Sequence, residues 1–192
     1  IDSGVNYTHP DLGGCFGIGC KIINGTDFFH NDNDPYDTDG HGTLVAGVVA
    51  ANGTAKGVAF GSKIVAIQDG DATPNEDYTT AGVDWCVNNA TKFNISVISI
   101  STKYSLNNSE NCFPTRPLSI AIKNARDLEI SVIVASGNDG SATQIGYPSC
   151  ANGSTSVGAT NDNDNLAIFG NRANILDLVA HGVKINTTNV NS

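Results

Sequence analysis

Three polar residues, an aspartate, a histidine and an asparagine, stand where their side chains can share one reaction. Asp2 follows a single apolar residue, His41 lies between two glycines before an apolar stretch, and Asn138 follows the run SVIVAS. A carboxylate can hold an imidazole in one tautomer, the imidazole can carry a proton, and an amide N–H can stabilise a developing negative charge. These residue types predict acyl-transfer catalysis, provided that the fold brings them together.

Each of the three residues also has a simpler structural interpretation. Asp2 can form a turn, Asn138 can cap the end of a strand, and His41 can be a hydrogen-bonded histidine beside a sheet. For any one residue alone the structural interpretation is the stronger one. The chemical interpretation therefore depends on how the elements place the three.

Alternating strands and helices predict that placement. Four short segments rich in β-branched residues are expected to be strands with both faces buried: 63–68, 95–101, 131–136 and 175–180. Helices are expected over residues 41–51, 76–92 and 117–128. This order predicts an α/β fold with a doubly wound parallel sheet. Asp2, His41 and Asn138 would then meet at the carboxyl edge of the sheet.

Length and charge exclude other classes of function. The 192 residues are expected to form one domain, residues 1–192, and no apolar run approaches the ~20 residues of a membrane span. Ten basic and nineteen acidic residues give a net charge of −9, which repels nucleic acid. We expect a soluble monomer with no nucleic-acid or membrane partner. A nucleotide-binding domain is a remote alternative, since neither phosphate-loop motif occurs.

Five cysteines indicate disulfides, because none of their spacings matches a paired zinc-ligand motif. Cys15 and Cys20 lie in the glycine-rich turn GGCFGIGC and can close a small loop. The other two disulfide candidates are Cys86, at the end of a helical stretch, and Cys112, in the loop after the next strand. Cys150 is then left over. The alternative is a set of buried free thiols.

N-x-[ST] sequons are more frequent than the roughly four expected by chance from this composition. The candidate glycosylation sites are Asn6, Asn24, Asn52, Asn89, Asn94, Asn107, Asn152 and Asn186. Together with the cysteines they predict a secreted or extracellular protein, with a merely Asn-rich composition as the alternative.

No cofactor is expected, with calcium as the one alternative. The loop 30–40, HNDNDPYDTDG, is dense in oxygen-bearing side chains and is a candidate calcium site. Its spacing does not fit the twelve-residue calcium loop, and turns favour Asp and Asn in any case.

Blocks around the three polar residues resemble a known protein family. IDSGVNYTHPDL, DGHGTLVAG and VIVASGNDG are similar, in this order, to signature blocks of the subtilisin-like serine proteases. Five more segments of the chain resemble further blocks of the family: GVAFGSKI, VISIS, IGYPSC, SVGAT and ILDLVAHGV. The resemblance therefore covers nearly the whole chain. It implies a subtilisin-like three-layer architecture.

The resemblance also implies a role for each residue. Asp2 orients the histidine, His41 is the general base and later the general acid, and Asn138 donates to the oxyanion. A polypeptide substrate would bind as an extended strand through backbone hydrogen bonds. The two implied substrate edges are Ser101, Thr102 and Lys103 on one side and Ala135, Ser136 and Gly137 on the other.

The nucleophilic serine of the family is not found in the 192 residues. In the family it sits in a G-T-S-M-A-like block after a strand that here ends in AHGV (180–183), and Ser192 lacks such neighbours. We expect a partial peptidase domain, truncated at both ends and inactive by itself. Its longer parent would be a secreted serine endopeptidase acting through an acyl-enzyme.

Some positions depart from the family pattern and support an alternative, a non-catalytic relative that serves as a binding or scaffold module. Leu44 replaces a second histidine, and Phe60 and His181 replace prolines. Lys103 replaces a substrate-edge glycine, where it would either block peptides or select acidic ones.

Two further departures concern calcium and disulfides. Asp11 resembles a calcium ligand of some family members, but AANGTAK is shorter than the loop that supplies the other ligands. Family members often pair a cysteine placed like Cys150 with one near residue 183, where this chain has Val183.

Overall fold

The structure is a computed structural model that describes residues 1–71, 73–107, 109 and 111–190. The chain divides into two compact units, the first made of Ile1–Gly82 with Asn186–Ser192 and the second of Val83–Ile185. The elements in chain order are η1 (Pro10–Leu12), β1 (Ile22–Asp27), α1 (His41–Ala50), β2 (Ile64–Gln68), α2 (Glu76–Asn88), α3 (Ala90–Phe93), β3 (Val97–Ile100), β4 (Ser105–Asn107), α4 (Pro117–Asp127), β5 (Ser131–Ala135), β6 (Ile145–Tyr147), β7 (Ser154–Thr160) and β8 (Leu178–His181).

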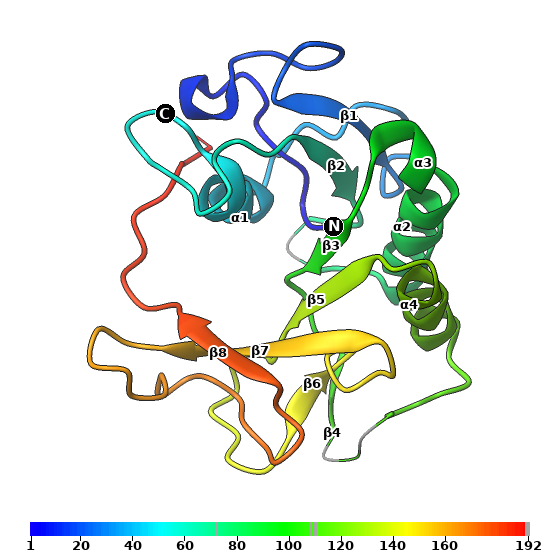
Figure 1. Ribbon diagram of the computed structural model, residues 1–192, viewed down its shortest axis with the longest axis vertical. Helices are drawn as coiled ribbons and strands as arrows, with labels where there is room; N and C mark the ends of the chain where they lie inside the picture. Colours follow the sequence, from blue (N-terminus) through cyan, green and yellow to red (C-terminus); the bar gives the residue numbers. More distant parts are fainter. Residues whose placement is uncertain (72, 108, 110, 191–192) are drawn as a thin grey trace. The chain divides into compact units, whose positions relative to one another are not determined.

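The first unit is built on a parallel pair of strands, β1 and β2, which lie side by side in Figure 1. Helix α1 packs close to η1. The buried core of this unit consists mainly of small and aliphatic side chains: Val5, Leu12, Ile22, Ala46, Ala51, Ala55 and Ala66. The sequence did not predict β1, because its residues IINGTD include Asn, Gly and Asp, which are rare in strands.

The expected strand end at Asp2 is present as one parallel bridge beside β2. Asp2 pairs with Gln68. Its backbone N–H donates to Ile67 O at 3.0 Å, and its carbonyl accepts from Asp69 N at 3.0 Å. These bonds fix the Asp2 backbone at the carboxyl end of β2.

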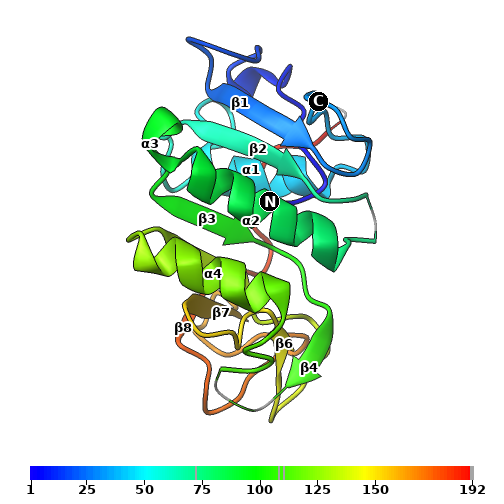
Figure 2. The same cartoon turned by 90° about the vertical axis from the view of Figure 1, so that its right-hand side faces the viewer.

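The second unit contains a four-stranded parallel sheet in the order β3-β5-β7-β8. Helix α4 packs against β5 and β7 (Figure 2), and its buried side chains have the three-and-four spacing seen in the sequence. On the sheet, Ile98, Ile100, Val132 and Val134 are almost completely buried. A short antiparallel pair, β4 with β6, lies in the same unit.

The parallel sheets and their helices confirm the predicted α/β class. The expectation that the strands have both faces buried holds for the last three residues of β2, which are all buried, and is wrong for the other predicted strands. In β3 and β5 only alternate residues are buried, and every residue of β8 is exposed. Strand β8 lies at the edge of the four-stranded sheet, beside β7. Strand β7 was not predicted, because STSVGAT consists mostly of small polar residues.

Candidate active site

The carboxylate of Asp2 and the imidazole of His41 contact each other in the first unit. His41 Nδ1 lies 2.6 Å from Asp2 Oδ1, and Ser3 N donates to the same oxygen at 2.8 Å. The Asp2 side chain is only 14% exposed, whereas that of His41 is 53% exposed. The carboxylate thus holds one ring nitrogen, and about half of the imidazole side chain is exposed.

Glycines on both sides of the histidine make this contact sterically possible. Gly40, which precedes α1, has a φ of 108°, in the left-handed region that favours glycine. A Cβ on Gly42 would lie 2.1 Å from Gly4 O. Only glycine therefore lets the first turn of α1 approach the segment that follows Asp2.

A buried carboxylate, Asp37, links the same two segments. It is completely buried, and its Oδ1 accepts hydrogen bonds from Ser3 Oγ at 3.0 Å and Gly40 N at 2.8 Å. Its Oδ2 accepts from Thr43 N at 2.8 Å and from the Thr43 hydroxyl. Ser3 Oγ in turn accepts from Gly42 N at 2.9 Å. Sequence reasoning missed Asp37, although a carboxylate just before an apolar helix favours its N-terminus and was a usable signal.

The Asp2–His41 contact shifts the pKa of both groups. The hydrogen bond that His41 donates to Asp2 raises the pKa of His41 above its usual value, against the opposing effect of partial burial. Burial acts to raise the pKa of Asp2, but the hydrogen bond and charge of His41 outweigh it, and that pKa is lowered. Nearby Asp69 is buried, which raises its pKa to about 6. The dyad therefore favours the protonated imidazole beside an ionised carboxylate.

Asn138 lies in the second unit, in the loop that follows β5, and its side chain is exposed. Buried Asn171 holds this loop on either side of it. Asn171 N donates to Gly137 O at 3.0 Å, and Asn171 Oδ1 accepts from Asp139 N at 2.9 Å and Ser141 N at 3.0 Å. Sequence reasoning missed Asn171, because no periodicity marks a buried side chain that binds several backbone groups of one loop. We call Asn171 with these bonds the Asn171 hub. The structure thus fixes the backbone around Asn138.

The two predicted substrate edges also belong to the second unit. Ser101 and Thr102 are half-buried and make no hydrogen bond to the described residues outside the strand ladders. On the other edge, Ser136 is buried, and its hydroxyl donates to Asn171 O at 3.0 Å. Ala135 ends β5 opposite Val157 of β7. Lys103 Nζ lies 2.9 Å from Asp139 Oδ1.

Comparison with known proteins assigns the family. The family model described as "Subtilase family" matches residues 1–192. This chain belongs to the subtilase family. A thermophilic serine proteinase of Bacillus sp. (strain AK1) is 36% identical over 98% of this chain and 44% of the relative. Subtilisin E of Bacillus subtilis (strain 168) is 32% identical over 98% of this chain and 47% of the relative. This subtilase therefore spans about half the length of these relatives.

Solved structures agree with the assignment. A cold-adapted subtilisin-like serine proteinase superposes on 99% of this subtilase and 64% of its own chain, with a TM-score of 0.78 and 26% identity. A psychrophilic protease gives a TM-score of 0.79 at 26% identity, over 100% of this chain and 67% of its own. Both support the subtilisin-like architecture.

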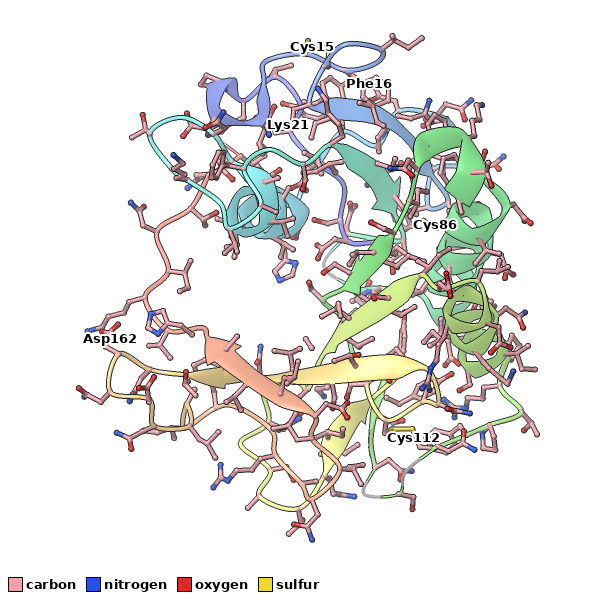
Figure 3. All side chains as sticks on the ribbon, in the orientation of Figure 1. Cys15, Phe16, Lys21, Cys86, Cys112 and Asp162 are labelled. Atoms are coloured by element: carbon pink, nitrogen blue, oxygen red, sulfur yellow. A yellow bond between two sulfur atoms is a disulfide. The ribbon has the colours of Figure 1, made fainter. Side chains whose placement is uncertain are left out.

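The disulfides of this subtilase confirm one expectation and correct another. Cys15 and Cys20 are bonded, with their Cα atoms 5.6 Å apart. The expected disulfide role of Cys86 is wrong: Cys112 pairs with Cys150, and Cys86 is a buried free thiol (Figure 3). The backbone bond from Cys112 N to Cys150 O, at 3.0 Å, brings the bonded pair together. Burial raises the pKa of Cys86 to about 11.

Asp11 of this subtilase is surrounded by hydrogen-bond donors. Its Oδ1 accepts from Thr54 N at 3.1 Å and its Oδ2 from Ala55 N at 2.7 Å. A Cβ on Gly53 would lie 1.9 Å from Oδ1, so the loop wraps tightly around the carboxylate. N–H groups repel a cation, and these residues do not fit a calcium site.

Three carboxylates of the acidic loop 30–40 accept hydrogen bonds within the first unit. Asp34 Oδ1 accepts from the Tyr7 hydroxyl at 2.8 Å, and Asp32 Oδ1 accepts from Asp34 N at 2.8 Å. Asp37 is bound to the start of α1. Within the described residues no three His, Cys, Asp or Glu side chains are grouped as metal ligands.

The sequons differ in accessibility. Asn6 does not fit a glycosylation site, because it is 4% exposed and its Nδ2 donates to Val190 O at 2.8 Å. Half-buried side chains are found at Asn24, Asn89 and Asn107, the last followed by a residue outside the described ones. Exposed side chains are found at Asn52, Asn94, Asn152 and Asn186.

Ser192, which was not assigned as the nucleophile, lies outside the described residues. Across the described residues, every helix is too short or too polar to cross a bilayer.

Proposed function

We propose that this chain is the Asp and His part of a secreted subtilisin-like serine endopeptidase, which hydrolyses peptide bonds through an acyl-enzyme. The observation that carries the proposal is the 2.6 Å contact between Asp2 Oδ1 and His41 Nδ1 beside an exposed imidazole. A carboxylate at Nδ1 fixes the tautomer whose Nε2 can accept a proton from a hydroxyl nucleophile.

In this proposal each residue has one role. Asp2 orients the imidazole and stabilises its protonated form, and His41 takes the proton of the serine and later gives it to the leaving amine. Asn138 donates to the oxyanion, and the Asn171 hub keeps its loop in place. An extended polypeptide would pair with the backbone of Ser101 and Thr102.

The serine itself is proposed to come from a longer chain. The 192 residues hold no G-T-S-M-A-like block, and relatives such as subtilisin E are about twice as long. The chain alone would then bind but not cleave. Secretion into an oxidising compartment, with glycans on exposed asparagines such as Asn52 and Asn94, is consistent with the two disulfides.

A fluorophosphonate probe tests the proposal on the full-length protein. We expect labelling of the wild type and none of His41→Ala, because the serine is not nucleophilic without its base. The matched control is His30→Ala: His30 Nδ1 also lies 2.6 Å from a carboxylate, Asp27, but outside the proposed site. Equal labelling of His41→Ala and His30→Ala, or no labelling of a chain that contains the serine block, would contradict the proposal.

A second candidate function is a non-catalytic binding module. The observation in its favour is the side chain of Lys103, which reaches across the implied substrate edges to Asp139. This module would bind an extended peptide without cleaving it. A full-length domain that lacks the serine block but binds peptides would support this candidate and exclude the endopeptidase.

A further inference from the structure

The side chain of Lys103 occupies a space walled by two glycines. A Cβ on Gly137 would lie 2.8 Å from Lys103 Cδ, and one on Gly146 would lie 2.7 Å from Lys103 Cβ. A side chain at Gly146 would therefore displace the lysine, and one at Gly137 would displace both the lysine and Asn171 Nδ2, which would lie 2.5 Å away. The aliphatic stem of Lys103 fills the gap that the two glycines leave.

The charged end of Lys103 is held as well. Its Nζ lies 2.9 Å from Asp139 Oδ1, and the other oxygen of Asp139 accepts from Asn171 Nδ2 at 2.7 Å. Both side chains of the ion pair are only about one third exposed, at 32% and 34%. Since Asn171 is buried and fixed to the loop backbone, Asp139 is a rigid anchor for the lysine. We call this arrangement, Lys103 with Asp139, the lysine bar.

The position of the bar relative to a substrate follows from the proposed function, on which this inference rests. If Asn138 donates to the oxyanion, the carbonyl under attack lies beside the loop 137–139. The residue that owns this carbonyl, the acyl residue, then has its side chain next to Gly137. Asn171 Nδ2 and the stem of Lys103 fill that space, 2.5 Å and 2.8 Å from where a Cβ on Gly137 would lie.

We propose that the lysine bar restricts the acyl residue of the substrate to small side chains, glycine, alanine or serine. A larger side chain has to displace the stem of Lys103 from Gly137 and Gly146 and break its ion pair with Asp139. The ammonium is already matched by a carboxylate, so selection of acidic substrates is the weaker outcome. Lys103 is thus a specificity-determining residue.

Cleavage of a peptide library by the full-length protease tests this proposal. We expect kcat/KM to be at least about tenfold higher with alanine than with phenylalanine as the acyl residue. In Lys103→Gly that preference should be lost, with kcat/KM for phenylalanine rising by about tenfold or more. The matched control is Lys184→Gly, an exposed lysine whose φ of 58° suits glycine and which should keep the wild-type profile. A wild-type preference for aspartate or glutamate, or an unchanged profile in Lys103→Gly, would overturn the proposal.

A second measurement on the same protein does not need activity. Acylation of lysine amines, followed by mass spectrometry, should be several-fold slower at Lys103 than at Lys184, and Asp139→Asn should speed it at Lys103 only. Equal rates at the two lysines in the wild type would overturn the bar itself. A third outcome is that acylation of Lys103 is slow but a fluorophosphonate does not label the protein. That result would count against the endopeptidase, and the lysine bar would then close one edge of a binding module.

Discussion

His41 and His30 each bind an aspartate through Nδ1 at 2.6 Å, yet only one of them resembles a catalytic histidine. His30 and Asp27 are three residues apart, and Asp27 also accepts from Phe29 N and His30 N, so this pair belongs to a local turn. Asp2 and His41 are 39 residues apart and meet only because α1 packs against the segment after Asp2. A contact that the fold must build is the better indication of function.

The Asp2–His41 contact predicts a pH dependence. The pKa of His41 is raised and that of Asp2 is lowered, each by the other. The stabilisation due to His41 is complete below its unfolded pKa of about 6.5 and is lost as pH rises through the raised folded value. That due to Asp2 is present above about pH 4 and is lost as pH falls through the lowered folded value. The pair therefore stabilises the fold most between about pH 4 and 6.5.

Titration of the histidine resonances by NMR measures the raised pKa of His41 on which this pH dependence rests. Asp2→Asn should lower the pKa of His41, because the carboxylate that favours its protonated form is removed. In the active protein the acidic limb of the pH–rate profile should move to lower pH accordingly. Asp27→Asn is the control, and it should lower the pKa of His30 without moving that of His41. The charges of Asp37 and Asp39 also face His41 and remain in both variants.

The element that matters most for the site is the first turn of α1. Buried Thr43 sits at its centre, where its hydroxyl donates to Asp37 and accepts from Asn6 N at 2.9 Å. Its carbonyl accepts from Thr188 Oγ1 at 2.7 Å. A single side chain thus ties α1 to the segment that follows Asp2, and the Asp37 carboxylate satisfies the start of the helix.

Thr43→Val should therefore destabilise the first unit. The change keeps the shape of the side chain but leaves the buried Asp37 carboxylate and Asn6 N–H each without one partner, at a cost of about 1–3 kcal/mol. Urea unfolding measures this loss. Thr43→Ser keeps the hydroxyl and should lose clearly less. If the two variants are equally stable, the hydroxyl is not what holds α1 in place.

For the whole molecule, the disulfides differ in how much chain they close. Cys112 and Cys150 are 38 residues apart, whereas Cys15 and Cys20 are 5 apart. In the chain-entropy model the longer loop contributes about 4 kcal/mol and the shorter about 2 kcal/mol, because the longer one restricts the unfolded chain more. The second unit therefore depends strongly on a single bond.

Two double variants test this difference. Cys112→Ser with Cys150→Ser should lower the free energy of unfolding by about 2 kcal/mol more than Cys15→Ser with Cys20→Ser. Alkylation gives an independent check, since only Cys86 should react, and only after denaturation, because its thiol is buried. Reaction of Cys150 in the denatured, unreduced protein would contradict the pairing.

The sequence by itself determined the elements with a strong local period. Helices α1 and α4 and strands β2, β3 and β5 lie where apolar spacing and β-branched runs predicted them, within about two residues at either end. It also singled out Asp2 and His41 by residue type and place. Strands β1 and β7 escaped prediction because β1 contains Asn, Gly and Asp after its two isoleucines and β7 consists mostly of small polar residues.

Only the tertiary structure decided which distant side chains meet. The Cys112–Cys150 disulfide, the hydrogen bond from Ser3 Oγ to Asp37 and the ion pair of Lys103 with Asp139 all join residues that are far apart in the sequence. The physical reason is that such contacts depend on close packing between elements. For example, the missing side chains of Gly42 and Gly137 leave room for Gly4 O and for the side chain of Lys103. Local sequence sets which elements form, and packing sets what their side chains touch.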